Sequence, residues 1–242
     1  MNTWMKNRGL AVILGITVPM LSGGCLSSGS ERTVANDPTE TLPAKYKTQE
    51  PVEQPDFRGD AESPEFQQAI MEASSLLGAQ PQPLVSPGER ENIPGGVSFD
   101  VPGDKVGTLL HDTHLQFLAK GYYLFRYEQN FGLGDRTDKV GLLPTTDKYA
   151  VMAVMETNGD NYNIGTSGVI AWMKDLEKDQ PFVLTGIGFD YMEGHLSAPV
   201  KDAEGLARRM YEFTPDIVDQ GVGSVDKLAD ELEKGTLYFW WD

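Results

Sequence analysis

The sequence is poor in cysteine and histidine, with one Cys and three His among 242 residues. A single cysteine excludes an internal disulfide, and Cys25 is the only sulfur that could serve redox or thiolate-metal chemistry. A histidine-based metal site would use up all three histidines. Because such cross-links are scarce, stability is expected to come from packing of the apolar residues, which make up 40% of the chain.

Basic residues are scarce as well: 20 Lys and Arg stand against 36 Asp and Glu, which gives a formal net charge of −16. The first 25 residues carry Lys6 and Arg8 and no acid, so the remainder carries −16 − 2 = −18. A surface of this charge repels phosphate backbones and anionic headgroups, so no nucleic acid is expected as a partner.

The apolar run near the amino terminus is too short to span a membrane as a helix. It covers residues 10–21, whereas roughly 20 residues are needed, and Pro19 interrupts it. Lys6 and Arg8 precede this run and small residues at 22–24 follow it, which is the layout of a secretory signal. Residues 1–24 are therefore predicted to be a signal peptide.

The sequence Leu-Ser-Gly-Gly-Cys at residues 21–25 resembles the lipobox of bacterial lipoproteins, with its leucine one place earlier than usual. The resemblance implies cleavage before Cys25 and acylation of that cysteine, for example with palmitate. Two or three acyl chains would give stable attachment to a bacterial membrane. Leu26, which is not an aspartate, implies the outer membrane of a Gram-negative host, on its periplasmic or surface face.

Composition divides the rest of the chain into three regions. Residues 25–60 are rich in Ser, Thr, Pro and charge, so the lipidated cysteine is predicted to be followed by a flexible, disordered tether. Residues 61–96 are predicted to hold one helix at 64–77, capped by Ser63 and followed by Gly78, and then a connector rich in Pro and Gly. Residues 97–242 are predicted to form a globular domain.

Apolar patterns within residues 97–242 predict a single α+β or α/β domain in which helices cover a sheet, with the strand order left open. Strands are expected at residues 97–101, 122–127, 182–189 and 236–241. Helices are expected at residues 106–120, 148–155, 167–178, 203–213 and 225–234, the third capped by Thr166 and the last by Ser224.

Four motifs stand out between about residue 148 and the end. They read Thr-Asn-Gly-Asp-Asn-Tyr at 157–162, Gly-Ile-Gly-Phe-Asp at 186–190, Pro-Asp-Ile-Val-Asp-Gln-Gly at 215–221 and Tyr-Phe-Trp-Trp-Asp at 238–242. Together they resemble a bacterial family known as domain of unknown function 4253. The resemblance implies a fold and no catalytic residue. Thr214 stands where the family often has a cysteine, so no thiol role carries over.

The histidines are the first candidate for chemistry. His111 and His114 lie three residues apart on a predicted helix, so they share a face and could bind Zn²⁺ together with His195 and with Asp190 or Glu193. The alternative is that His114 packs among apolar neighbours while His111 faces water.

Carboxylates are the second candidate. Asp190, Glu193, Asp216 and Asp219 could supply a general acid and a general base, which a glycosidase-type hydrolase holds about 5 to 10 Å apart. The alternative is that these acids are solvated or cap helices.

The remaining candidates are binding residues. Asn158, Asp160, Asn161 and Tyr162 could contribute to a Ca²⁺ site or form only a turn between two helices. Gln220 lies in a predicted turn that could face a ligand. Trp240 and Trp241 point to opposite sides of the last predicted strand, so one is expected in the core, and the other could stack on a ligand or lie under a helix.

No complete catalytic motif is present, which favours a non-catalytic, lipid-anchored protein of the cell envelope. Such a protein would bind an envelope or extracellular protein, as an accessory or immunity-type factor. The alternative is an envelope hydrolase that uses the carboxylates or a His-bound metal. No cofactor is predicted, and contact with the membrane is expected through the lipid on Cys25.

Overall fold

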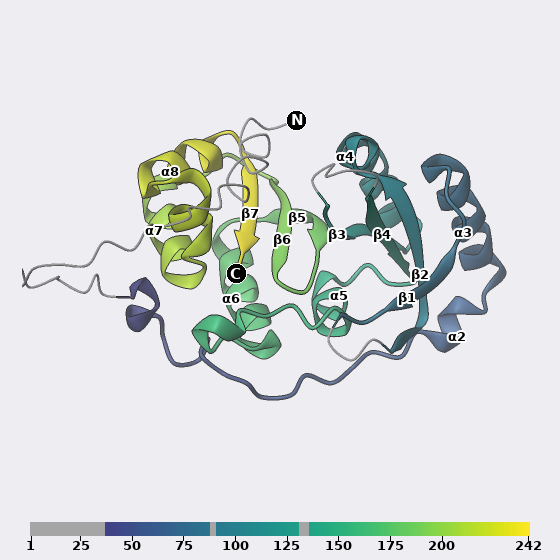
Figure 1. The fold of residues 1–242 in the computed structure, drawn as a ribbon, viewed down its shortest axis with the longest axis horizontal. Helices are drawn as coiled ribbons and strands as arrows, with labels where there is room; N and C mark the ends of the chain where they lie inside the picture. The colour runs from purple at the N-terminus through teal and green to yellow at the C-terminus, as the bar shows by residue number, and fades with distance from the viewer. Residues whose placement is uncertain (1–36, 88–90, 131–135) are drawn as a thin grey trace, which may run out of the picture.

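The computed structural model describes residues 37–87, 91–130 and 136–242 (Figure 1). The predicted signal peptide, Cys25 and the first part of the predicted tether lie outside these residues. The described chain forms a single domain with helices on both faces of a seven-stranded mixed sheet, so the predicted fold class is confirmed. Among these residues, no helix is long and apolar enough to cross a membrane.

The sheet has the strand order β1-β2-β4-β3-β5-β6-β7, and only the β3–β5 pair is parallel. The strands are β1 (Gln82–Val85), β2 (Asn92–Pro102), β3 (Tyr123–Glu128), β4 (Thr137–Leu143), β5 (Phe182–Ile187), β6 (Tyr191–Leu196) and β7 (Thr236–Trp240). The β3–β5 ladder has one registered pair, Arg126 with Gly186. We call this ladder the central seam, because it joins the half-sheet β1–β4 to the half-sheet β5–β7.

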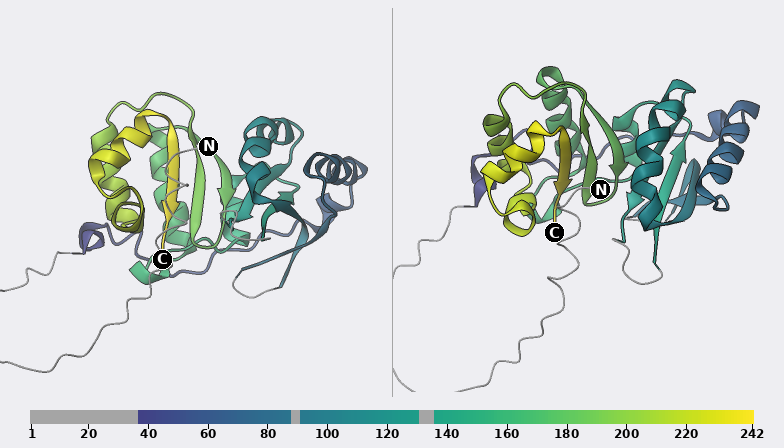
Figure 2. Two further views of the ribbon diagram at one scale, coloured as in Figure 1. Left: turned by 45° about the horizontal axis from the view of Figure 1, so that its top comes forward. Right: turned by 90° about the horizontal axis from the view of Figure 1, so that it is seen from above.

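Helices cover the two faces of the sheet unequally. The longer ones are α3 (Pro64–Leu77), α4 (Gly103–Ala119), α5 (Lys148–Val154), α6 (Thr166–Asp179), α7 (Ala203–Phe213) and α8 (Val225–Glu233). The helices α3 and α4 pack on one face, over β2, β3 and β4, whereas α5 to α8 contribute to the core on the opposite face. As a result α3 and the pair α7–α8 lie at opposite ends of the molecule (Figure 2).

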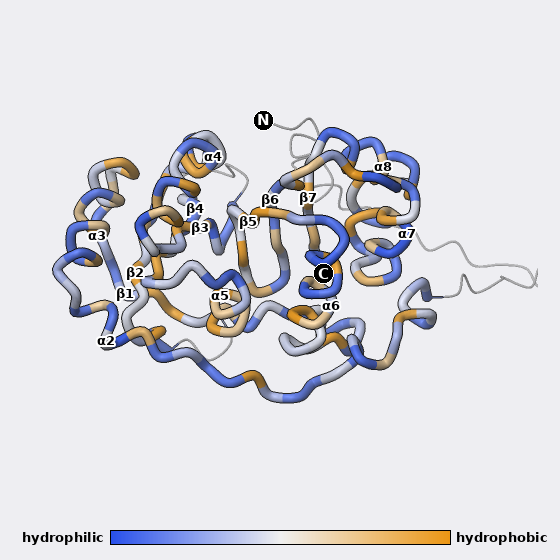
Figure 3. The backbone as a smooth tube through the Cα atoms, turned by 180° about the vertical axis from the view of Figure 1, so that it is seen from behind, coloured by the Kyte–Doolittle hydropathy of each residue, from blue (hydrophilic) through white to orange (hydrophobic). Residues whose placement is uncertain are grey.

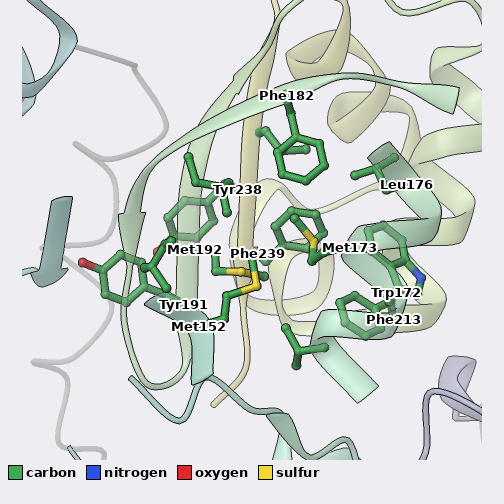
Figure 4. Close-up of a cluster of buried hydrophobic side chains, with 14 of the residues drawn as sticks. Met152, Trp172, Met173, Leu176, Phe182, Tyr191, Met192, Phe213, Tyr238 and Phe239 are labelled. Carbon is green, nitrogen blue, oxygen red and sulfur yellow. The ribbon is translucent and has the colours of Figure 1, made fainter. Parts of the chain in front are cut away.

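Aromatic rings fill the core beneath α6 and α7 (Figure 4). The ring of Trp172 stacks on that of Phe213 with centroids 4.4 Å apart, and Phe239 of β7 meets Trp172 edge-on at 5.4 Å. These three residues are almost completely buried. The apolar positions of α6 and α7 thus fix both helices against the β5–β7 half of the sheet, as their helical spacing predicts.

The segment predicted to be a flexible tether is packed along the body from residue 37 onward. It begins with the short helix η2 (Pro38–Thr41) beside α7 and runs past α6 to α2 (Arg58–Ala61). Leu42, Tyr46 and Phe57 are buried in the main core, and the Tyr46 hydroxyl donates to Asp175 of α6 at 2.8 Å. We call residues 42–57 the strap. Figure 3 shows why its sequence reads as polar: isolated hydrophobic positions punctuate a largely hydrophilic run.

Strands β1, β4 and β6 were not predicted. The expected connector at 81–96 contains β1 and the beginning of β2, and the start of α6 also differs. Gly165 is the N-cap of that helix and Thr166 its first residue, with no side-chain capping bond, so the predicted cap is wrong. The caps of α3 and α8 are as predicted, since the Ser63 and Ser224 hydroxyls accept bonds from backbone N–H groups three residues later.

Candidate functional site

Three of the family-like motifs meet around the carboxylate of Asp216, which is 4% exposed. Its Oδ1 accepts hydrogen bonds from the Tyr162 hydroxyl at 2.9 Å and from the Gln220 side-chain amide at 2.8 Å. Its Oδ2 accepts one from the backbone N–H of Asp242 at 2.9 Å. Burial and the bond to Asp216 raise the pKa of Tyr162. One carboxylate thus ties together η3 (Asp160–Tyr162), η4 (Ile217–Val222) and the chain end.

Trp241 completes this arrangement, which we call the C-terminal latch (Tyr162, Asp216, Gln220, Trp241, Asp242). The Trp241 indole N–H donates to the carbonyl of Phe213 at 3.0 Å, and the side chain is buried. A Cβ atom on Gly159 would stand 2.6 Å from the indole ring, so only glycine permits this approach. The motif containing Gly159 and the terminal Trp-Trp-Asp therefore fit each other directly.

The Asn158 to Asn161 segment forms a turn that its own side chains hold. The Asn158 amide oxygen accepts the backbone N–H of Asp160 at 3.0 Å, and the Asn161 amide donates to the Asp242 carbonyl. Gln49 of the strap donates to the Asp160 carboxylate at 3.2 Å. These oxygens and amides are engaged in closing the loop between α5 and α6.

The four candidate carboxylates lie in different surroundings. Asp216 belongs to the latch, and Asp219 is exposed nearby and accepts a bond from the Tyr211 hydroxyl at 3.1 Å. Asp190 is exposed at the β5–β6 turn, where its backbone carbonyl accepts the N–H of Trp241 at 2.9 Å. Glu193 is buried at the central seam.

A buried ion-pair network at the seam was not predicted. The Arg126 guanidinium donates to Glu193 Oε1 through Nε at 2.8 Å and to Asp138 Oδ2 through Nη1 at 3.0 Å. The three residues are 4%, 8% and 1% exposed. Burial opposes the charge on Arg126, but Glu193 and Asp138 outweigh it and raise the pKa of Arg126. A lone charge inside the apolar run Tyr-Tyr-Leu-Phe-Arg-Tyr was the sequence signal that could have revealed it.

Tyr191 lies close to this network. Its ring stacks on Tyr238 with centroids 6.4 Å apart (Figure 4), while its buried hydroxyl has no hydrogen-bond partner. Burial and the nearby Glu193 raise the pKa of Tyr191 well above its usual value. The hydroxyl is therefore neutral at physiological pH.

All three histidines gather where α4 meets β6. The rings of His111 and His195 are 6.3 Å apart, and the charge of His195 acts on His114. His114 is buried, with Nδ1 2.7 Å from the Leu124 carbonyl, and its Nε2 has no partner. His114 thus packs in the interior while His111 is exposed, which is the alternative to a metal site that the sequence left open.

Metal binding is not favoured by the arrangement. Within the described ranges, no group of three or more His, Cys, Asp or Glu side chains is placed to hold a metal ion. The rings of His111 and His195 face each other, whereas His114 is buried with Nδ1 at a backbone carbonyl.

The two terminal tryptophans differ in exposure, as predicted. Trp241 is buried against the core, whereas Trp240 is only half-buried and lies on the other face of β7. The backbone carbonyl of Trp240 accepts a bond from the Thr214 hydroxyl at 2.5 Å. Thr214, which follows α7, thus fastens that helix to β7.

Comparison with known proteins identifies the carboxyl-terminal part. Residues 139–242 match the model of a family described as "Domain of unknown function (DUF4253)", which confirms the resemblance seen in the motifs. The matched segment begins inside β4 and contains the whole C-terminal latch. Searches of curated proteins and of solved structures gave no significant match.

Proposed function

We propose that this chain, which carries a DUF4253 domain at residues 139–242, is a lipid-anchored envelope protein whose folded domain binds another protein without catalysing a reaction. The observation that carries the proposal is the distribution of exposed apolar side chains. Of the four large apolar side chains that are exposed in the described part, Met71, Leu76 and Leu115 lie on α3 and α4, with exposed fractions of 66%, 42% and 54%. The fourth, Phe189, is at the β5–β6 turn.

The α3–α4 surface also has a shallow depression of about 440 Å³, lined by Leu76, Leu109 and the charged residues Asp104 and Lys105 among others. Apolar side chains beside a groove between two helices are a usual docking surface for a partner's apolar side chains. Because the exported part has a net charge of −18, the partner that fits is an envelope or extracellular protein with apolar anchors flanked by Lys and Arg.

The site of attachment supports this use of the surface. Asp37, the first described residue, comes twelve positions after Cys25, so lipid on Cys25 would hold η2 within about 40 Å of the bilayer at full extension. The helix η2 packs beside α7, at the end of the molecule opposite to α3 (Figure 1). The α3–α4 surface would therefore project away from the membrane.

The hydrolase alternative has less support. Asp216 is saturated by three donors and Glu193 is paired with Arg126, so neither is held ready for proton transfer. The α3–α4 depression and a second one of about 260 Å³ beside η2 contain none of the four candidate carboxylates. A hydrolase would instead bring two of them together in one cleft.

A site-specific photo-crosslinking experiment tests the binding proposal. A photoreactive amino acid replaces Leu76 or Leu115 in the full chain, expressed in its host, and Asp230 on the far helix α8 serves as the control position. We expect the same crosslinked protein from positions 76 and 115, and none from position 230. The double variant Leu76→Glu, Leu115→Glu should lose the partner while its unfolding free energy changes by less than about 0.5 kcal/mol per site. Equal crosslinking at all three positions would contradict the proposal.

Metabolic labelling tests the anchor separately. Cells given an alkyne-tagged palmitate should label the wild-type chain and leave the Cys25→Ser variant unlabelled and uncleaved. Because this readout does not depend on a partner, an unlabelled wild-type chain would refute lipidation and leave the binding proposal standing.

A further inference from the structure

The helix α4 meets the β5–β7 half of the sheet along one edge, and the histidines lie on that edge. Residues His111, His114 and Leu118 follow each other at helical spacing, and Leu118 packs against the main core while His111 faces His195 of β6. The edge lies beside the central seam, where a single registered pair links β3 to β5. It is thus a contact between the two half-sheets that does not depend on the β ladder.

The neutral ring of His114 can take up a further proton only at Nε2, the nitrogen that faces no hydrogen-bond acceptor. The Leu124 carbonyl can only accept, so Nδ1 carries the hydrogen in the neutral ring and Nε2 carries none. Nε2 is buried and has no hydrogen-bond partner. The rings of His114 and Tyr123 pack edge-on, with their centroids 4.9 Å apart. A proton on Nε2 would place an unpaired donor and a full charge in the interior.

His195 is half-buried and His111 is exposed, so both can reach protons. Burial and the neighbouring His111 lower the pKa of His195. Burial lowers the pKa of His114 against the opposing effect of its bond to Leu124, and the charge of His195 lowers it further. Each proton taken up at this edge therefore makes the next one less favourable.

Among the described residues near this edge, the opposite charges are bound elsewhere or exposed to water. On β6, Glu193 shares the face of His195 but is bound by Arg126 of β3, whose other partner is Asp138 of β4. On β5 and β7 the residues paired with His195 are Val183 and Thr236, which carry no charge. The charged α4 residues Asp104, Lys105 and Asp112 are exposed, as is Lys120 directly after that helix.

We propose that the α4–β6 edge is a pH-sensitive joint, closed when His114 and His195 are neutral and loosened as they gain protons below about pH 6.5. The sign follows from the direction of the shifts. A histidine whose pKa is lower in the folded than in the unfolded state contributes full stability above its unfolded pKa of about 6.5, and that contribution is lost as the pH falls. Loosening would expose Leu118, Tyr123 and the ion pairs of the seam to water.

The net negative charge of the molecule predicts the opposite change in melting temperature on acidification, so the measurement distinguishes the two effects. Acidification reduces the repulsion within a chain of net charge −16, so without the joint the melting temperature should be level or rise between pH 7.5 and 5.5. With the joint, we expect the wild-type chain to melt roughly 3 °C or more lower at pH 5.5. A chelator is present throughout, so that bound metal ions do not contribute.

The matched variants are His111→Gln, which alters an exposed helix position, and the double variant His111→Gln, His195→Gln. Both should melt near the wild-type temperature at pH 7.5, and the double variant should lose part of the acid-induced fall in melting temperature, because His114 remains in it. Hydrogen exchange, corrected for the intrinsic effect of pH, should show acid-induced opening of α4 and β6 in the wild type, with α3 unchanged as an internal control. If the double variant does not fold, His111→Gln alone should still reduce the acid-induced decrease in melting temperature.

The proposal would be refuted if the melting temperature of the variants decreased on acidification as much as that of the wild type. It would also be refuted by a wild-type chain whose α4 and β6 protection is the same at both pH values. The joint goes beyond the proposed binding function, since neither readout requires a partner.

Discussion

The two half-sheets are held in different ways. The β5–β7 half, which belongs to the family match, is closed by the C-terminal latch, in which Asp216 receives three hydrogen bonds from its own chain. The β1–β4 half mostly precedes the match, and its helices α3 and α4 leave Met71, Leu76 and Leu115 in water. The polar residues of the family-like motifs thus serve internal closure, whereas the surface suited to a partner lies largely outside the matched segment.

This difference separates what identifies the family from what could distinguish one member from another. Residues that recur at fixed spacing because they close a fold need not take part in chemistry. Arg126 is the exception to the division, since it precedes the match yet pairs with Glu193 inside it. A substitution at the central seam is therefore the strongest test of how the two half-sheets differ.

Replacing Arg126 with Met should have the largest effect. It leaves Glu193 and Asp138 buried without a counter-charge, so we expect a loss of about 3 to 5 kcal/mol in unfolding free energy at pH 7. Acid relieves the cost of burying two negative charges without a counter-charge, so the deficit should shrink as the pH falls towards 4. Urea unfolding at several pH values measures both effects.

The matched control for that variant is the triple change Arg126→Met, Asp138→Asn, Glu193→Gln, which removes the stranded charges and should recover much of the loss. If Arg126→Met alone were as stable as the wild type, the halves would not depend on this ion pair. Arg126 would then not be the residue that holds the two half-sheets together.

A substitution in the latch should have an intermediate effect confined to the family half. Asp216→Asn turns one acceptor oxygen into a donor that faces donors, so we expect a loss of about 1.5 to 3 kcal/mol. The exposed Asp219→Asn is the control and should change stability by less than about 0.5 kcal/mol. Hydrogen exchange should locate the loosening in η3, η4 and β7 and leave α3 protected. Loosening of α3 to the same degree would show that the halves open as one unit.

Much of the fold could be predicted from local patterns, and the failures have physical reasons. All the predicted helices exist, because their apolar residues recur at helical spacing, and in α3 good caps at Ser63 and Gly78 mark the ends. The strands β4 and β6 escaped detection because Asp138 and Glu193, which partner Arg126, break their apolar alternation. A buried charge looks like a surface charge until its partner is known.

The sequence predicted which residues belong to the candidate site better than it predicted what those residues do. The motif residues Tyr162, Asp216 and Gln220 were each singled out, and the structure brings them together. Their mutual satisfaction could not be foreseen, since a sequence does not show which donor meets which acceptor. The gathering of His111 and His195 was foreseen for a metal, yet the structure offers only two facing rings.

The strap gives the prediction with the smallest effect on overall stability. A Cβ atom on Gly168 of α6 would stand 2.0 Å from the carbonyl oxygen of Tyr46, so Gly168→Ala must push the strap away. The alanine also favours the helix by about 1 kcal/mol, so global unfolding should change by no more than about 1 kcal/mol in either direction. Limited proteolysis should nevertheless cleave residues 42–57 much faster than in the wild type. The control is Ser167→Ala, one residue earlier in α6, which should leave the strap protected. Equal cleavage of Gly168→Ala and wild type would mean that the strap is not held by this contact and behaves as the free tether that its composition predicted.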